Sequence, residues 1–341
     1  MDDDDILILC GGEVSSLLSG KEESVIDLVA EAYKAHGRGD SSLPHSIFLN
    51  FPGDQKNRII ALPAYLGESF KVAGIKWIAS FPENINEGMN RASAVVILNS
   101  ARTGRPEAII EGSIISAKRT AASAALAART LQDGDKTKRA GILGCGLISF
   151  EIARFLSVAC PQIDSLLIYD LDPARSEQFR NKCRQSFGLS AEIAPDLGTV
   201  LKECKLVSLA TTALKPHISD LSACAPGSTI LHVSLRDLTP EVILSCDNVV
   251  DDVSHVCRSN TSLHLAEQKV GDRNFIRCTL ADILDGHTPP RKDKEGVTVF
   301  SPFGLGVLDL ALSKYVYEKG SEQGKGTRIK SFLPGLWSEG Q

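Results

Sequence analysis

The sequence predicts an α/β protein that combines a Rossmann-type parallel-sheet domain with a second domain of α+β type. Three observations lead to this fold class. Short apolar segments alternate with helical segments from about residue 119 onward, as in parallel sheets with crossover helices. A glycine-rich loop follows the first of these segments, and turn-separated apolar runs fill residues 1–118. We therefore expect domains at residues 1–118 and 119–305, with residues 306–341 completing the first domain.

The composition is that of a globular protein that binds neither nucleic acid nor a membrane. Of the 341 residues, 43% are hydrophobic and 23% charged, and the chain is long enough for two domains with their own cores. The net charge of −5 argues against a nucleic-acid surface, and no apolar run approaches the roughly 20 residues that span a bilayer. The acidic start Met1–Asp5 is the opposite of a basic signal peptide, so we expect a cytoplasmic protein.

Nine cysteines are spread along the chain without any C-x-x-C pair. Their odd number and wide spacing argue against a disulfide framework and against a structural zinc site. The seven histidines also lack metal-site spacing such as H-E-x-x-H. We expect free thiols in a reducing compartment and no bound metal.

The first domain is expected to contain antiparallel hairpins. A predicted strand at residues 6–9 precedes a helical pattern that ends near Gly37. Turn residues such as Pro52-Gly53-Asp54 then separate further apolar runs. These runs predict strands at residues 46–51, 58–63, 73–78 and 94–99.

The second domain is expected to begin with an alanine-rich helix over residues 119–131. Helices are predicted at residues 147–159 and 173–186. The predicted strands lie at residues 140–144, 165–169, 191–194, 206–210, 229–233 and 248–251. A strand at 297–301 and a helix at 306–318 then return to the first domain, and the glycine-rich remainder from residue 320 is predicted to be a tail or arm.

A G-x-G-x-x-S loop, Gly144-Cys145-Gly146-Leu147-Ile148-Ser149, joins the first strand of this domain to its helix. Such a loop lets the backbone approach a pyrophosphate and points the helix N-terminus at the phosphates. Asp170 ends the next strand, 21 residues after Ser149, where a carboxylate accepts hydrogen bonds from the ribose. No arginine follows Asp170 immediately, so NAD is favoured over NADP. Thr211 and Thr212 follow a later strand, either as cofactor contacts or as ordinary loop residues.

Four cations associated with the first domain stand among apolar residues in the sequence: Arg58, Lys76, Arg91 and Arg119. A lone Lys or Arg is usually solvated at the surface. A lysine in the middle of an apolar strand is harder to explain in this way, because burying it unpaired is costly. Such cations would suit a substrate that carries carboxylates.

Asp237 is the candidate proton carrier, because it follows a predicted strand and so lies at the ligand-binding edge of the sheet. The alternative is that Asp237 caps a helix that begins near Pro240. His232 could also act as the base, although a histidine inside an apolar strand is more typically a hydrogen-bonded core residue.

In these segments the chain resembles the ornithine cyclodeaminase/μ-crystallin family over nearly its whole length. The matching segments are Arg58–Pro63, Gly74–Ile78, Thr103–Pro106, Arg119–Ala122, the glycine loop, Asp237, Val250–Asp252 and Phe303–Leu310. Within the family the chain is most similar to the N-(2-amino-2-carboxyethyl)-L-glutamate dehydrogenases of 2,3-diaminopropionate biosynthesis. This likeness lies in Arg91–Asn99, Ile142–Ile148 and Val250–Ser254.

The resemblance implies a homodimeric enzyme in which the first domain binds substrate and dimerises. In this branch NAD oxidises the secondary amine of a substrate with three carboxylates. The imine then hydrolyses to L-2,3-diaminopropionate and 2-oxoglutarate, for siderophore or peptide natural products. Implied substrate contacts are Arg58, Lys76, Arg91, Ser93 and Arg119, with Lys76 and Asp237 catalytic. Implied cofactor contacts are Thr120, Gly144, Gly146, Leu147, Ile148, Asp170, Thr211, Thr212 and Ser234.

One segment departs from the cyclodeaminase pattern. Ornithine cyclodeaminases carry a Gly-Asp-Cys-Pro-Gly-Lys-type segment at their catalytic aspartate, whereas this chain has Leu235-Arg236-Asp237-Leu238-Thr239-Pro240. The departure argues against ornithine as the substrate. Three alternatives remain open at this point: an ornithine cyclodeaminase, a ketimine or imino-acid reductase, and a non-catalytic binding protein of crystallin type.

Overall fold

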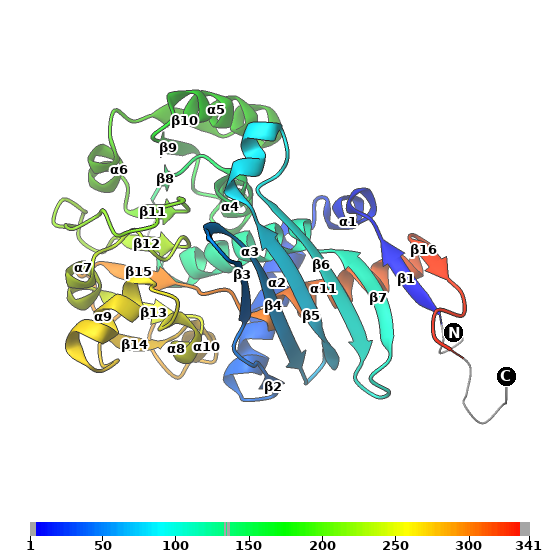
Figure 1. Cartoon of the computed structure of the whole chain (residues 1–341). Helices are drawn as coiled ribbons and strands as arrows, with labels where there is room; N and C mark the ends of the chain where they lie inside the picture. Colours follow the sequence, from blue (N-terminus) through cyan, green and yellow to red (C-terminus); the bar gives the residue numbers. More distant parts are fainter. Residues whose placement is uncertain (1–4, 133, 135–136, 335–341) are drawn as a thin grey trace. The chain divides into compact units, whose positions relative to one another are not determined.

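The structure is a computed structural model, and it describes residues 5–132, 134 and 137–334 (Figure 1). The first three acidic residues of the N-terminal run, Asp2–Asp4, and the end of the expected tail lie outside the described residues. The chain divides into two compact units. The first contains the described residues up to Lys21, then Arg38–Arg119, and the chain from Leu305 onward; the second contains Glu22–Gly37 and Thr120–Gly304.

The first unit is built on a mixed sheet with the strand order β16-β1-β7-β6-β5-β4-β2, and β3 pairs with β4 beside this path. Its neighbours are antiparallel except β1 and β7, which are parallel. The strands are β1 (Ile6–Leu9), β2 (Ser41–Ser42), β3 (Ile47–Phe51), β4 (Asp54–Leu66), β5 (Val72–Ser80), β6 (Ala92–Ser100), β7 (Pro106–Glu111) and β16 (Thr327–Ile329).

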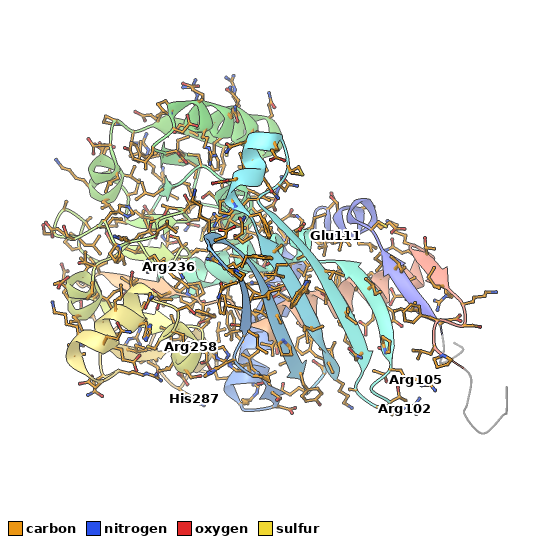
Figure 2. All side chains as sticks on the ribbon, in the orientation of Figure 1. Arg102, Arg105, Glu111, Arg236, Arg258 and His287 are labelled. Atoms are coloured by element: carbon orange, nitrogen blue, oxygen red, sulfur yellow. The ribbon has the colours of Figure 1, made fainter. Side chains whose placement is uncertain are left out.

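Helix α11 (Gly306–Glu322) packs against β4, β5 and β6 on one face of this sheet. Gly306 permits the close approach, because a Cβ atom there would lie 3.2 Å from the carbonyl oxygen of Leu62. The other elements of the unit are α1 (Gly11–Leu18), η1 (Pro82–Glu87) and the start of α3 (Ser113–Leu131). Glu111, labelled in Figure 2, accepts hydrogen bonds from the backbone N–H groups of Ser113 and Ile114 and so caps α3.

The second unit is a parallel sheet with the strand order β10-β9-β8-β11-β12-β15-β13-β14. The strands are β8 (Arg139–Leu143), β9 (Ser165–Tyr169), β10 (Ser190–Ile193), β11 (Leu206–Leu209), β12 (Thr229–His232), β13 (Asp247–Val250), β14 (Ile276–Thr279) and β15 (Thr298–Ser301). The helices are α2 (Glu22–Gly37), α4 (Leu147–Ala159), α5 (Pro173–Phe187), α6 (Leu197–Glu203), α7 (Pro240–Ser245), α8 (Val253–Val256), α9 (Ser262–Val270) and α10 (Leu280–Leu284), together with the rest of α3.

The second unit is a doubly wound parallel sheet and the first is a mixed sheet with helices, which confirms the predicted fold class. In the described part of the chain, no helix combines the length and the apolar character that crossing a bilayer requires.

Two local predictions were wrong. The single helical pattern expected before Gly37 is two helices, and the second of them, α2, belongs to the second unit rather than to the first. Helix α2 buries Val25, Ile26 and Val29 and contacts α4 and α10. The expected tail also contains a strand, because β16 pairs antiparallel with β1 and places Ile329 opposite Ile6.

Candidate active site

The glycine loop of the second unit adopts the geometry of a dinucleotide-binding turn. Gly144 has φ +89°, and a Cβ atom there would lie 2.7 Å from the carbonyl oxygen of Ala210, so only glycine fits without strain. The Cys145 N–H donates to Oδ2 of Asp170 at 2.7 Å, and the Asp172 N–H donates to Oδ1 at 2.9 Å. The loop is thereby fixed to the end of β9, with α4 beginning at Leu147.

Five of the predicted cofactor residues line one cavity of about 600 Å³ in this unit: Gly144, Gly146, Asp170, Thr211 and Thr212. The remaining lining residues were not predicted, and they are Leu143, Cys145, Tyr169, Leu171, Asp172, Arg175, Leu197, Ala210, Ala213, His217 and Ile218. Cavity and loop together fit a bound dinucleotide, since the backbone is open to a pyrophosphate and a carboxylate stands at the strand end.

Other predicted cofactor residues lie outside that lining. Leu147 and Ile148 form the first turn of α4, where Leu147 is 60% exposed, and Thr120 lies within α3. Arg175 is the cation that sequence reasoning overlooked at the cavity. Its Nε lies 3.6 Å from Oδ2 of Asp172, so a carboxylate already accompanies it.

Asp237 is fully buried and surrounded by polar groups. Its carboxylate accepts hydrogen bonds from the hydroxyls of Thr211 and Ser234. Nε2 of His232 lies 3.5 Å from Oδ2, and Nε2 of His217 lies 4.0 Å from Oδ1. Burial by itself raises the pKa of Asp237, but His232 and the two hydroxyls outweigh burial and hold that pKa below its ordinary value.

Asp237 is linked to the nucleotide-type cavity through its neighbours, because Thr211 and His217 also line that cavity. The helix-capping alternative was wrong, since Thr239 occupies the N-cap of α7. His232 is fully buried, and its Nδ1 lies 3.2 Å from the Ser301 hydroxyl. The structure thus places the Asp237 carboxylate next to residues that line the cavity, and the buried His232 contacts this carboxylate.

The first unit contains a buried cluster of two cations and one carboxylate. Lys76, on β5, donates to Oδ2 of Asp309 at 2.7 Å and to the Ser116 hydroxyl at 3.2 Å. Nε of Arg119 donates to Oδ1 of Asp309 at 3.0 Å. Burial lowers the pKa of Lys76 to about 8; Asp309 opposes this shift and Arg119 adds to it.

Arg58 and Arg91 form a second cationic group in the first unit. Arg58 pairs with Ser80, and Ser80 pairs with Ala92, so Arg58 and Arg91 lie at neighbouring positions. Burial lowers the pKa of both guanidinium groups, and the charge of Arg58 lowers that of Arg91 further. Arg58 lies on the same sheet face as Lys76, because it is an even number of residues from Leu62, the cross-strand partner of Lys76. Its Nε is buried without a hydrogen-bond partner.

Ser93 is not brought to these cations. Ser93 pairs with Ala79, which is an odd number of residues from Lys76 on the same strand. The Ser93 side chain therefore projects from the opposite face of the sheet, where it is exposed. The predicted contact of Ser93 with a substrate held by Lys76 is therefore not supported.

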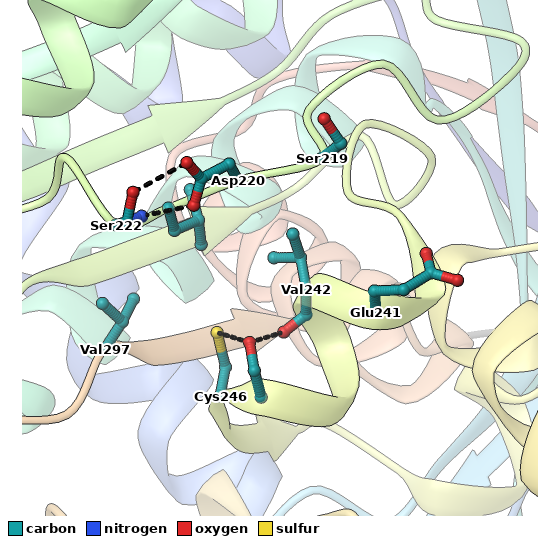
Figure 3. A pocket seen from close by; sticks show the side chains of 9 residues that line it. Ser219, Asp220, Ser222, Glu241, Val242, Cys246 and Val297 are labelled. Atoms are coloured by element: carbon teal, nitrogen blue, oxygen red, sulfur yellow. Dashed lines mark hydrogen bonds between the residues drawn. The ribbon is translucent and has the colours of Figure 1, made fainter.

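A second hollow of the second unit, of about 430 Å³, contains none of the predicted site residues (Figure 3). Its carboxylates already have partners: Asp220 accepts from the Ser222 N–H and hydroxyl, and Glu241 pairs with Lys269. Within the described ranges, no group of three or more His, Cys, Asp or Glu side chains could hold a metal ion.

Sequence reasoning missed Asp309, the partner of two predicted substrate cations. A signal was present, because Asp309 is the one charged residue between Gly306 and Ser313 in an otherwise apolar helical stretch. Burial of a charge at such a position requires a partner of opposite sign.

A doubly wound unit with a glycine loop, a cavity and a buried acid defines a dinucleotide-binding protein of the dehydrogenase class. The chain belongs to the ornithine cyclodeaminase/mu-crystallin family, whose family model matches residues 8–324. The family predicted from the sequence is thereby confirmed.

Several relatives match nearly the whole chain. The N-((2S)-2-amino-2-carboxyethyl)-L-glutamate dehydrogenase of Staphylococcus aureus is 27% identical over 342 residues, which cover 96% of this chain and 99% of that relative. A Thermococcus litoralis Δ1-pyrroline-2-carboxylate reductase, solved in complex with NADH and L-proline, superimposes with a TM-score of 0.87 at 26% identity, covering 95% of this chain and 100% of that one. An archaeal alanine dehydrogenase dimer with bound NAD gives a TM-score of 0.85 at 26% identity, covering 96% and 99%.

Proposed function

We propose that the protein oxidises N-(2-amino-2-carboxyethyl)-L-glutamate with NAD and releases L-2,3-diaminopropionate and 2-oxoglutarate. The observation that carries this proposal is a set of four cations in the first unit: Lys76 and Arg119 share the carboxylate of Asp309, and Arg58 and Arg91 form the second cationic group. This excess of positive charge suits a substrate with three carboxylates better than one with a single carboxylate. The similarity to the S. aureus dehydrogenase supports the same substrate.

The class of enzyme and the cofactor follow from the relatives of the chain. The three relatives described above are dehydrogenases or a reductase, and the two solved ones hold NADH or NAD. The protein is an oxidoreductase that uses NAD, as predicted. When bound, NAD accepts a hydride from the substrate carbon. The glycine loop would hold its pyrophosphate and Asp170 its ribose.

The reaction is balanced by one water molecule. The hydride leaves the glutamyl α-carbon, the amine nitrogen loses its proton, and a C=N bond forms. Water then adds to that carbon, and the C–N bond breaks to give the ketone of 2-oxoglutarate and the primary amine of diaminopropionate. Asp237 would take a proton from the attacking water, because its lowered pKa keeps it ionised at neutral pH.

Each cation has a separate role in the proposal. Lys76 would bind the carboxylate beside the reacting carbon, since it is the most deeply buried of the four. Arg58, Arg91 and Arg119 would bind the remaining carboxylates, for which guanidinium groups offer paired donors.

Imino-acid reduction is the second candidate function. It uses the same hydride chemistry in the opposite direction, and the T. litoralis reductase supports it through its close structural match. Redox-neutral conversion of ornithine to proline is a third possibility, although the segment around Asp237 departs from the cyclodeaminase pattern.

The predicted homodimer is proposed to form through the sheet face opposite α11. Three large apolar side chains stand exposed there: Ile47 is 67% exposed, Leu49 46% and Trp77 39%. Ile47 and Trp77 are both cross-strand partners of Ala61, so they lie on one face, and a second copy of the chain would cover it. A Trp77→Asp variant should be monomeric by light scattering, and an unchanged mass would contradict this interface.

The substrate is tested by supplying purified protein with NAD and synthetic N-(2-amino-2-carboxyethyl)-L-glutamate, with L-ornithine and with Δ1-pyrroline-2-carboxylate plus NADH in parallel. We expect equal amounts of NADH and 2-oxoglutarate from the first reaction. Proline and ammonia from ornithine without net NADH would instead identify a cyclodeaminase, and preferential oxidation of NADH by the cyclic imine would identify a reductase.

A further inference from the structure

Asp309 is the centre of the buried cluster in the first unit, and neither the family resemblance nor the proposed reaction assigns it a role. The residue is fully buried on α11 and accepts from Lys76 through one carboxylate oxygen and from Arg119 through the other. Lys76 comes from β5 and Arg119 from α3, so a single carboxylate joins three elements. Lys76 is 233 residues from Asp309 in the sequence and Arg119 is 190 residues from it, so only tertiary folding brings the three side chains together.

The cluster has more positive charge and more donors than Asp309 can use. An ammonium group has three N–H donors, and Asp309 and Ser116 account for two of those on Lys76. The bond of Arg119 to Asp309 uses Nε alone, which leaves the Nη groups of the guanidinium fork for other partners. Two cations and one carboxylate carry a net charge of +1, and in a buried place this charge calls for an anion.

We propose that Asp309 is a positioning residue for substrate binding: it holds the Lys76 ammonium charged and orients the third N–H of Lys76 and the Arg119 guanidinium toward the substrate carboxylates that they bind. The inference rests on the proposed function, because it assumes that Lys76 and Arg119 bind substrate. Asp309 itself has both oxygens engaged by the two cations and is not proposed to touch the substrate.

The physical basis is a balance of charges at Lys76. Burial and the positive charge of Arg119 lower the pKa of Lys76, whereas the charge of Asp309 and its hydrogen bond raise it, and the result is a pKa of about 8. These are the titratable groups that act on Lys76, from α11 and from α3, and the Ser116 hydroxyl completes its contacts. Without the carboxylate, Lys76 would lose its proton near neutral pH and with it the ability to bind an anion.

The test is the titration of Lys76 in the full-length protein, followed by NMR of lysines labelled with ¹³C at the ε-carbon. A Lys76→Met variant assigns the resonance. In the wild type we expect a midpoint near pH 8, and in Asp309→Asn a midpoint at least one pH unit lower. In Asp309→Glu the midpoint of Lys76 should return toward the wild-type value, because the negative charge is restored.

Asp251→Asn is the matched control. Asp251 is equally buried, but it lies in the second unit and accepts backbone N–H groups from Asp252, Phe303 and Gly304. Its replacement reports the general effect of losing a buried carboxylate, and the Lys76 midpoint should stay where it is. A Lys76 midpoint that is the same in wild type and Asp309→Asn would overturn the proposal.

A kinetic measurement separates positioning from mere structural damage. In Asp309→Asn, kcat/KM for the adduct should fall about tenfold or more at pH 8 and recover as the pH is lowered, because acid restores the charge on Lys76. A loss of equal size at every pH would contradict the proposal. If the NMR shift occurs but the wild type does not oxidise the adduct, the positioning role stands and the proposed substrate fails. If the wild type oxidises the adduct but the NMR shift does not occur, the proposed substrate stands and the positioning role of Asp309 fails.

Discussion

Asp309 in the first unit and Asp237 in the second are both carboxylates buried among polar groups, but their neighbours differ. Asp309 in the first unit is held by two cations, Lys76 and Arg119. Asp237 in the second unit is held by two hydroxyls and lies beside two imidazole rings. Both side chains are fully buried, so the contrast lies in the partners and not in the degree of burial.

The partners decide what each carboxylate can do. Protonating Asp309 would leave two cations buried without their counter-charge, and this is costly. Asp309 is therefore suited to hold cations and unsuited to exchange protons. Asp237 can take up a proton without breaking a pair of fixed opposite charges, and Thr211 and His217 connect it to the nucleotide-type cavity. Under the proposed function, proton transfer would therefore fall to the second unit and recognition of substrate carboxylates to the first.

The largest expected effect is that of Asp237→Asn. The amide keeps the shape of the side chain but cannot act as a base, so kcat should fall by about 10³-fold. NADH should bind as in the wild type, because the glycine loop is unchanged; fluorescence titration with NADH checks this. Turnover within tenfold of the wild type would remove Asp237 from the mechanism and with it the contrast between the two carboxylates.

A smaller effect is expected from Lys76→Met, which should lower kcat/KM by about 10²-fold through loss of one carboxylate contact. Steady-state kinetics with the adduct measure this loss.

The pH profile of kcat/KM for the wild type should show a descending limb at alkaline pH. Because the pKa of Lys76 is about 8 and its charged form is the one that binds, kcat/KM should fall tenfold per pH unit above that value. Initial rates at low substrate concentration from pH 6 to pH 10 test this. A limb that persists unchanged in Lys76→Arg would exclude Lys76 as its source.

Arg91→Gln should raise KM by about tenfold and leave kcat nearly unchanged, as expected for a group that binds substrate and transition state equally. Steady-state kinetics with the adduct give both constants. A fall in kcat at constant KM would instead place Arg91 in the chemical step, and the division of roles between the units would need revision.

The smallest effect is expected from His232→Asn. His232 helps to lower the pKa of Asp237, so its removal should raise that pKa. Asp237 must be ionised to act as a base, so activity should be lost at a higher pH on the acid side, whereas activity at pH 8, where Asp237 stays ionised, should hardly change. The acid limb of kcat/KM is the measurement. An acid limb at the wild-type position would show that His232 has only a packing role.

The sequence allowed the second unit to be predicted more fully than the first. Its glycine loop, Asp170 and the alternation of strands with helices are local patterns, and they predicted five of the residues that line the cavity. Lys76 was also predictable, since a charge within an apolar strand requires a partner.

What the sequence could not provide depends on tertiary packing and on register. The pairing of Lys76 with Asp309 joins residues that are 233 positions apart. Ser93 lies on the wrong face because strand pairing puts it opposite Ala79, and a shift of one residue would reverse its direction. Helix α2 shows no sign in its own sequence of the unit that it joins; the contacts with α4 and α10, and the hydrogen bond of Tyr33 to Ser123 at 2.7 Å, decide this.

The most direct test of the proposed reaction uses N-(2-amino-2-carboxyethyl)-L-glutamate with deuterium at the glutamyl α-carbon. Mass spectrometry of the nicotinamide product and of the 2-oxoacid follows the label. We predict one deuterium in each reduced nicotinamide and an equal amount of 2-oxoglutarate without deuterium at its ketone carbon. Reduced nicotinamide without deuterium, or recovery of the substrate with its label intact while another amino acid is turned over, would contradict the proposed reaction.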